Sequence, residues 1–175
     1  VSGVQVGNGL DPDTEMGPLV SREQFDRVNG YVKIGQDEGA SLVVGGERLT
    51  EGELAKGYFF PPTVFDDVNN EMQIAQEEIF GPVISVIPFR EIDEVISLSN
   101  TTRYGLAGGV WTRDVSKAHR LAKALQAGVV WVNCYNVFDA PMPFGGYKMS
   151  GYGRESGLHA LELYTQVKSV WIKVN

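Results

Sequence analysis

Residues 83–134 read VISVIPFREIDEVISLSNTTRYGLAGGVWTRDVSKAHRLAKALQAGVVWVNC and alternate between two kinds of segment. Apolar runs of strand length occupy 83–89, 106–111 and 129–134, and segments with helical spacing occupy 91–98 and 115–125. Strands that are apolar on both faces and alternate with helices are typical of a parallel sheet covered by helices. We therefore predict an α/β fold with a β-α-β-α-β parallel open sheet.

The segments before this stretch contain one helix and two extended runs. Residues 1–20 are rich in Gly and Pro and predict turns and loop. Ser21 and Gln24 have the spacing of a capping box, and the apolar residues that follow predict an amphipathic helix that ends at Gly39. Residues 40–44 and 58–68 are expected to be extended.

The segments after it are a loop, a short helix and a terminal strand. Residues 135–157 are rich in Pro and Gly, and residues 158–163 suit a short helix. Val167 to Val174 alternate as a strand does, but no hairpin partner lies nearby in the sequence. An unpaired apolar strand invites pairing with another chain, so we expect this strand to mediate self-association.

Composition and charge narrow the class of protein. The chain has 175 residues, of which 43% are hydrophobic and 21% charged, as in an ordinary globular domain. Its net charge of −7 argues against nucleic acid and anionic membranes as partners. No apolar stretch approaches the ~20 residues of a membrane-spanning helix, and no signal peptide is apparent at residue 1. We predict a cytoplasmic protein without a metal site.

Cys134 is the only cysteine, and it follows an apolar strand where catalytic groups of parallel sheets often lie. A nucleophilic thiol needs a nearby base or cation. The two histidines, His119 and His159, both fall in predicted helices, and nothing in the sequence brings them to the thiol. We therefore favour a packing role for Cys134 over an independent thiol enzyme.

The acidic pair Glu77–Glu78 precedes Ile79, Phe80 and a Gly-Pro break that leads into the first apolar run. Adjacent carboxylates usually mark a solvated helix end. A carboxylate on a loop beside a sheet can instead accept both hydroxyls of a ribose, as acidic residues do in dinucleotide sites, while an aromatic neighbour packs on a flat ring. Both interpretations stay open at this point.

The glycine-rich loop 141–157 does not match a phosphate-binding motif. Its Gly151, Gly153 and Gly157 have one residue too many for the dinucleotide fingerprint and follow a loop, and Lys148 lacks the spacing of a P-loop lysine. Phe138 and Phe144 lie beyond the end of a strand, where aromatic side chains either line a pocket mouth or cover a core edge.

Several ordered motifs together resemble the NAD(P)-dependent aldehyde dehydrogenase family, specifically its C-terminal portion. The matching segments are EEIFGPV at 77–83, VWVNCYN at 130–136 and PFGGYKMSG at 143–151, with shorter matches at 60–64, 104–106 and 153–155. The resemblance therefore extends over nearly the whole chain. It implies that residues 1–163 form the C-terminal part of the catalytic domain and that 164–175 form an oligomerisation strand.

The resemblance also implies roles for particular residues. Glu78 would bind the ribose beside the nicotinamide of NAD or NADP, Phe80 would contact the nicotinamide, and Asn136, Phe138 and Phe144 would face the aldehyde. In that family a Cys attacks the aldehyde and a Glu activates the water that hydrolyses the thioester. Both lie in motifs upstream of this sequence, and Cys134 matches neither, so no catalytic residue is expected here.

Two hypotheses about function follow. In the first, the chain belongs to a longer parent enzyme that oxidises a small-molecule aldehyde to a carboxylic acid with NAD(P)+. The remaining part of the parent is then a partner of this chain, and the parent forms a homodimer or homotetramer. In the second, the polypeptide is an inactive, self-associating structural fragment.

Overall fold

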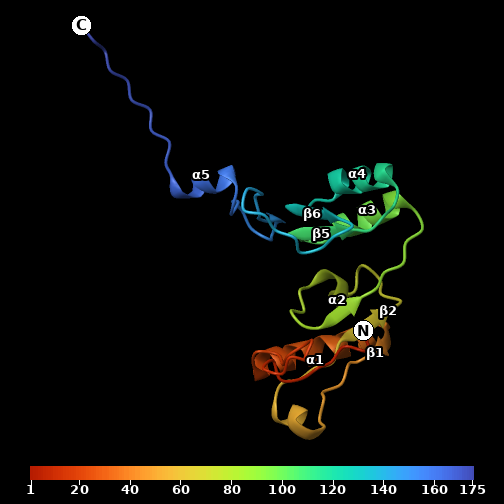
Figure 1. Cartoon of the computed structure of the whole chain (residues 1–175). Helices are drawn as coiled ribbons and strands as arrows, with labels where there is room; N and C mark the ends of the chain where they lie inside the picture. The colour runs from red at the N-terminus through yellow and green to blue at the C-terminus, as the bar shows by residue number, and fades with distance from the viewer. The chain divides into compact units, whose positions relative to one another are not determined.

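A computed structural model describes all residues from 1 to 175, and its contacts divide the chain into two compact units. The first unit comprises Val1–Pro88 and the second Phe89–Asn175 (Figure 1). The division falls inside the predicted segment 1–163, whose assignment to one catalytic domain stays a prediction. None of the helices is both long and apolar enough to cross a bilayer.

The first unit is a three-stranded sheet with one long helix. Strand β2 lies in the middle, antiparallel to β1 and parallel to β3. The extended segments predicted at 40–44 and 58–68 are confirmed by β1 and β2. The elements are α1 (Arg22–Asp37), β1 (Ser41–Val44), the 3-10 helix η1 (Gly52–Lys56), β2 (Thr63–Asp66), α2 (Gln73–Gln76) and β3 (Val83–Ser85).

Helix α1 begins as predicted, because the Ser21 side chain accepts a hydrogen bond from the Gln24 N–H at 3.2 Å. The second half of the capping box does not form, since the Gln24 amide donates to a distant loop instead. The buried face of α1 packs into the main core, where Gly35 leaves room for Ile74 and Phe65. The core consists of Val28, Tyr31, Val32, Ala40, Phe60, Phe65, Val68, Ile74 and Ile79.

The first apolar run, 83–89, differs from the prediction in its sheet, its length and its burial. Strand β3 pairs with β2 rather than with the later strands, and it ends at Ser85. Pro88 has no backbone N–H, so a longer ladder would lose a hydrogen bond there. Ile84 is 54% exposed, so the expected burial of this strand on both faces is not seen in this chain. The prediction that all three apolar runs form one parallel sheet is therefore wrong, because β3 lies in a different sheet from β5 and β6. The α/β class, the parallel pairing and the open sheets are confirmed.

The second unit contains the predicted β-α-β arrangement. Strands β5 and β6 are parallel, and α4 connects them and packs against both. Asp114 caps α4 by accepting hydrogen bonds from the Ser116 and Lys117 N–H groups, as an aspartate just before a helix commonly does. The elements are α3 (Ile92–Asn100), β4 (Tyr104–Gly105), β5 (Ala107–Val110), α4 (Val115–Ala124), β6 (Val129–Val132), β7 (Tyr147–Lys148), η2 (Leu158–Ala160) and α5 (Leu161–Tyr164).

Burial is unequal between the units. Ten of the twelve buried hydrophobic residues lie in the first unit, and only Val110 and Trp131 lie in the second. After α5 the chain runs on without forming a strand (Figure 1), and Val167 and Trp171 are 102% and 95% exposed. The predicted short helix is confirmed by η2 and α5. The pairing of residues 167–174 with another chain stays a prediction.

Candidate functional site

The loop of residues 77–82 joins α2 to β3 and borders a hollow of about 370 Å³ in the first unit. Both predicted cofactor-binding residues, Glu78 and Phe80, line this hollow. The other lining residues are Ile74, Ala75, Glu77, Ile79, Gly81, Val83, Ser85 and Ile87. Most of the lining side chains are apolar, and the two carboxylates, Glu77 and Glu78, come from the loop.

The loop buries one side chain and exposes its two neighbours. Ile79 is 8% exposed and inserts into the core, whereas Glu78 is exposed and Phe80 is 72% exposed. Phe80 has φ of 56°, in the left-handed region that residues other than glycine adopt rarely. The buried isoleucine therefore anchors a loop that presents a carboxylate and an aromatic ring to solvent two residues apart.

The two adjacent glutamates have different surroundings. The Glu77 carboxylate accepts hydrogen bonds from the Tyr31 hydroxyl at 2.6 Å and from the Gln73 amide at 2.9 Å. The Glu78 carboxylate makes no hydrogen bond or ion pair within residues 1–175, and only its backbone carbonyl is bonded. Of the pair, Glu78 is the one whose charged oxygens are available to a ligand.

Two polar side chains of α1 donate hydrogen bonds to the backbone of this loop. The Gln24 amide donates to the Ile79 carbonyl at 3.1 Å and to the Phe80 carbonyl at 2.6 Å. The Arg27 guanidinium donates to the Glu78 carbonyl and, at 3.4 Å, to the Ile79 carbonyl. Sequence reasoning linked neither residue to this loop. Their spacing places them on one face of α1, but nothing local identifies a partner more than 50 residues away.

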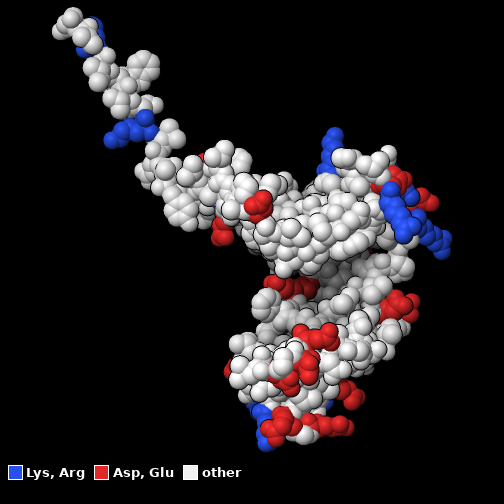
Figure 2. Space-filling view, in the orientation of Figure 1, with Lys and Arg blue, Asp and Glu red and all other residues white.

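The first unit is strongly acidic. It carries 15 of the 22 acidic residues but only 5 of the 15 lysines and arginines. Figure 2 shows acidic side chains gathered over this unit and basic ones near the ends of α3 and α4. A negative surface disfavours phosphate groups and suits hydroxyl donors. The negative charge of this unit therefore weighs against a phosphate group at the hollow.

A second hollow, of about 360 Å³, lies in the second unit and contains the predicted aromatic residues. The Phe138 ring packs edge-on against Trp131 at 5.6 Å between centroids and against Phe144 at 5.3 Å. Asn136, with φ of 58°, is exposed and does not line this hollow. The structure thus brings Phe138 and Phe144 together but not Asn136.

Cys134 is exposed, so the expected packing role is wrong for this chain. Strand β6 ends at Val132, and Asn133, with φ of 55°, turns the chain away from the sheet before the thiol. Cys134 lines the hollow of Phe138, but no histidine does. His119 borders a separate hollow beside α4, and His159 lies near Glu162.

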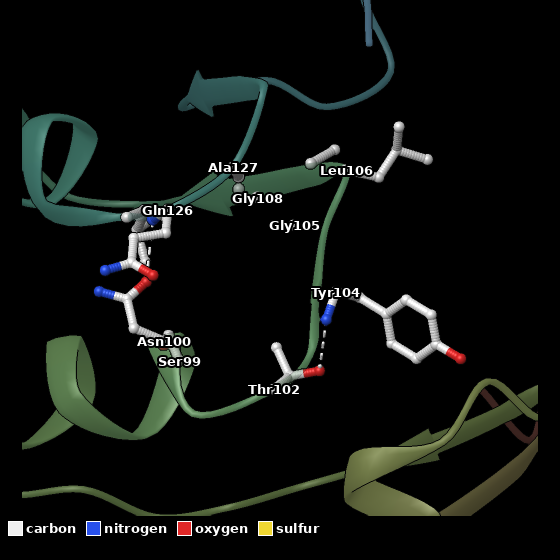
Figure 3. Close-up of a pocket in the computed structure, with 12 residues that line it drawn as sticks. Ser99, Asn100, Thr102, Tyr104, Gly105, Leu106, Gly108, Gln126 and Ala127 are labelled. Atoms are coloured by element: carbon white, nitrogen blue, oxygen red, sulfur yellow. Dashed lines mark hydrogen bonds between the residues drawn. The ribbon is translucent and has the colours of Figure 1, made fainter. Parts of the chain in front are cut away.

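A third hollow, of about 390 Å³, lies between the end of α3 and β5 (Figure 3). One of its two amide side chains is already used: Asn100 donates to the Ala124 carbonyl at 2.9 Å and accepts from the Gln126 backbone N–H at 2.8 Å. No Asp, Glu, His, Cys, Lys or Arg lines it. The hydroxyls of Ser99, Thr102 and Tyr104 line it, but no side chain that could activate them as a base does.

The cations of the glycine-rich loop bond to the backbone. The Lys148 ammonium donates to the Asn100 and Thr102 carbonyls at 2.8 and 2.9 Å, and Arg154 donates to the Gly146 and Gly153 carbonyls. They fasten this loop to the end of α3 and to itself. In residues 1–175 no group of three His, Cys, Asp or Glu side chains could hold a metal ion.

Comparison with known proteins gives consistent matches along the chain. The model of the aldehyde dehydrogenase family matches residues 1–170. The mitochondrial aldehyde dehydrogenase of Equus caballus is 54% identical over 169 residues, 97% of this chain and 33% of that protein. The betaine aldehyde dehydrogenase of Mesorhizobium japonicum is 51% identical over 97% of this chain and 35% of its own length. The NAD+ complex of the Bacillus cereus aldehyde dehydrogenase superposes with a TM-score of 0.93 and 52% identity, over 99% of this chain and 35% of that one.

Proposed function

Because this chain belongs to the aldehyde dehydrogenase family, we propose that it is the C-terminal portion of an enzyme that oxidises an aldehyde to a carboxylic acid with NAD(P)+. The chain spans about a third of the length of the relatives it matches. The second unit supports the proposal, since it leaves Trp111, Phe138 and Tyr147 at least 45% exposed and buries few apolar side chains. Large exposed apolar areas are typical of surfaces that another part of a protein covers.

One observation carries the cofactor assignment: the loop of residues 77–82 presents an unpaired carboxylate and an exposed ring at the same hollow. The two oxygens of Glu78 match two vicinal hydroxyls, and Phe80 offers an aromatic face or edge to a flat ring. The acidic surroundings suit a neutral ribose and leave the phosphates to other parts of the parent. These residues fit the nicotinamide end of NAD(P)+.

NAD(P)+, when bound, would supply the acceptor for the hydride that leaves the substrate carbon. The residues of this chain orient rather than react. Glu78 fixes the ribose through its two oxygens, and Phe80 limits movement and water at the adjoining ring. The nucleophilic cysteine and the water-activating glutamate of the family belong to the portion of the parent outside this chain, and Cys134, without a histidine beside it, does not replace them.

The aromatic hollow is proposed to face the aldehyde. Phe138 and Phe144 pack together there with Trp131 and Met142 and favour an aliphatic or aromatic aldehyde over a strongly charged one. Asn136 stands outside the hollow in this chain and would join it only with the rest of the parent in place.

The terminal segment 164–175 is proposed to pair with a neighbouring subunit, giving a homodimer or homotetramer. Val167, Val170, Trp171, Ile172 and Val174 are all at least 70% exposed. A segment that extends another chain's sheet gains main-chain hydrogen bonds and buries such side chains. The cytoplasmic location stays a prediction.

The alternative is that the isolated chain is an inactive, self-associating fragment, which the same exposed terminal segment favours. A sample of verified mass should show no aldehyde-dependent reduction of NAD+. Turnover that persists through repurification would contradict the assignment of the nucleophile and base to another portion of the parent.

The assignment of Glu78 is tested by Glu78→Gln in the full-length parent, with Glu71→Gln as control, because Glu71 is exposed and does not line the hollow. Glutamine keeps the shape but loses charge-assisted hydrogen bonds worth about 1.5–3 kcal/mol each. Single-turnover hydride transfer should slow about tenfold or more, while NAD+ affinity changes less, since the adenine half binds elsewhere. Unchanged hydride transfer in Glu78→Gln would show that Glu78 is a surface residue.

A further inference from the structure

The loop of residues 77–82, here named the cofactor loop, accepts backbone hydrogen bonds from the side chains of one helix, α1. Three successive carbonyls, those of Glu78, Ile79 and Phe80, accept hydrogen bonds from Gln24 and Arg27 of α1. Because these carbonyls face α1, the adjoining side chains of Glu78 and Phe80 are left on the solvent side. Both donors are remote from the loop in sequence, so the contact depends on the tertiary fold.

We propose that Arg27, assisted by Gln24, is a positioning residue that sets the direction of the Glu78 carboxylate. Nη2 of Arg27 donates to the carbonyl of Glu78 itself, and Nε donates to the next carbonyl. Two donors of one planar group thereby fix the two successive peptide units that follow the functional carboxylate. The inference rests on the proposed role of Glu78 at the ribose.

The guanidinium is itself held in place. It lies over the Tyr31 ring, 5.0 Å from the centroid, and Nη2 donates to the Tyr31 hydroxyl at 3.3 Å. Tyr31 in turn donates to the Glu77 carboxylate at 2.6 Å. Gln24, Arg27 and Tyr31 follow one another on a single face of α1, as side chains three and four residues apart do.

This arrangement also distinguishes the two acids. Tyr31 of α1 and Gln73 of α2 both donate hydrogen bonds to the Glu77 carboxylate. Arg27 instead donates to the backbone carbonyl of Glu78 and leaves the Glu78 carboxylate without a partner. Only one of the two adjacent carboxylates is then presented to a ribose. A lysine in place of Arg27 would keep the charge but has one nitrogen, which cannot donate to both carbonyls in the same planar geometry.

The test uses Arg27→Met in the full-length enzyme, with Lys33→Met as matched control. Methionine keeps an unbranched stem and removes the donors; Lys33 lies on the same helix, is exposed and makes no side-chain bond in the structure. We expect crystal structures of the cofactor-free enzymes to show the Glu78 carbonyl and carboxylate displaced from their wild-type positions in Arg27→Met. Lys33→Met should match wild type, and unchanged positions of both groups in Arg27→Met would overturn the proposal.

The second readout asks whether Arg27 acts through Glu78. Arg27→Met should slow single-turnover hydride transfer about 10- to 100-fold, because misplacement by about 1 Å has effects of this size. In a Glu78→Gln background the same substitution should cost less than about threefold, since the group it positions is already gone. Fully multiplicative losses would mean that Arg27 acts independently of Glu78 and would overturn the proposal.

The outcomes separate the two claims. If Glu78→Gln alone transfers hydride at the wild-type rate, the proposed function fails, and the positioning role fails with it. If Glu78→Gln is slow but Arg27→Met acts independently of it, only the positioning role fails. Should Arg27→Met not fold, Arg27→Lys and Gln24→Met provide milder losses of the same donors, with the same expectations for the position of Glu78 and for hydride transfer.

Discussion

Gly81→Ala should displace the cofactor loop, because the loop passes very close to α1 at this residue. A Cβ on Gly81 would lie 2.4 Å from Cγ2 of Val28. Ordinary carbon contacts are about 3.5–4.0 Å, so the two groups must separate by about 1 Å or more. Val28 is fully buried in the core and cannot yield easily. The loop, whose neighbouring Glu78 and Phe80 face solvent, is therefore expected to move.

The expected magnitude follows from two effects. Overpacking a core contact costs about 1–3 kcal/mol in the free energy of unfolding. A shift of about 1 Å at a group that orients the cofactor can slow the chemical step about 100-fold. Gly81→Ala should thus impair hydride transfer more than its modest effect on stability would suggest.

The assay combines urea unfolding with single-turnover hydride transfer in the full-length enzyme. Gly30→Ala is the control, since a Cβ there meets nothing within 4 Å and alanine favours the helix by about 1 kcal/mol. Val28→Ala makes room for the new methyl group, so the double variant should recover part of the hydride-transfer rate. Wild-type hydride transfer in Gly81→Ala, or no recovery in the double variant, would refute the reasoning.

Two further predictions concern other parts of the chain. Truncation of the parent after Leu163 removes the exposed apolar terminal segment and should shift the oligomer toward monomers or aggregates, with α4 and strands β5 and β6 intact; sedimentation showing an unchanged oligomer would exclude intersubunit pairing. Hydrogen bonds from the Arg90 and Glu91 N–H groups lower the pKa of Glu94 from its ordinary 4.5, so they stabilise the fold above that pH and the contribution is lost as pH falls below it. Glu94→Gln should therefore lose less stability than wild type when urea midpoints are compared from neutral pH to below 4.5, and equal losses would contradict this.

Features that depend on neighbouring residues were predictable from the sequence. Ser21 and Asp114 cap their helices because the N–H groups that they accept from lie two or three residues away. The parallel pair β5–β6 follows from an amphipathic helix between two apolar runs. The acidic pair before an apolar Gly-Pro break left two interpretations open, and only the family resemblance assigned roles to Glu78 and Phe80.

Features that depend on distant partners were not predictable. The Gln24 side chain matched a capping box, yet the carbonyls of a loop more than 50 residues away compete for its amide. The sequence of β3 predicted that it belongs to one sheet with the later strands β5 and β6, but β3 pairs with the earlier strand β2. Cys134 looked buried because it follows an apolar run, whereas Asn133 turns the backbone outward just before it. In each case pairing or backbone geometry outweighs the local pattern.

The most direct test of the central claim is a crystal structure of the full-length parent with NAD+ bound. The account predicts that the Glu78 carboxylate lies about 2.5–3.0 Å from both hydroxyls of the nicotinamide ribose, while Glu77 remains bonded to Tyr31. A ribose bound by Glu77, or a Glu78 carboxylate directed into solvent away from the cofactor, would contradict it.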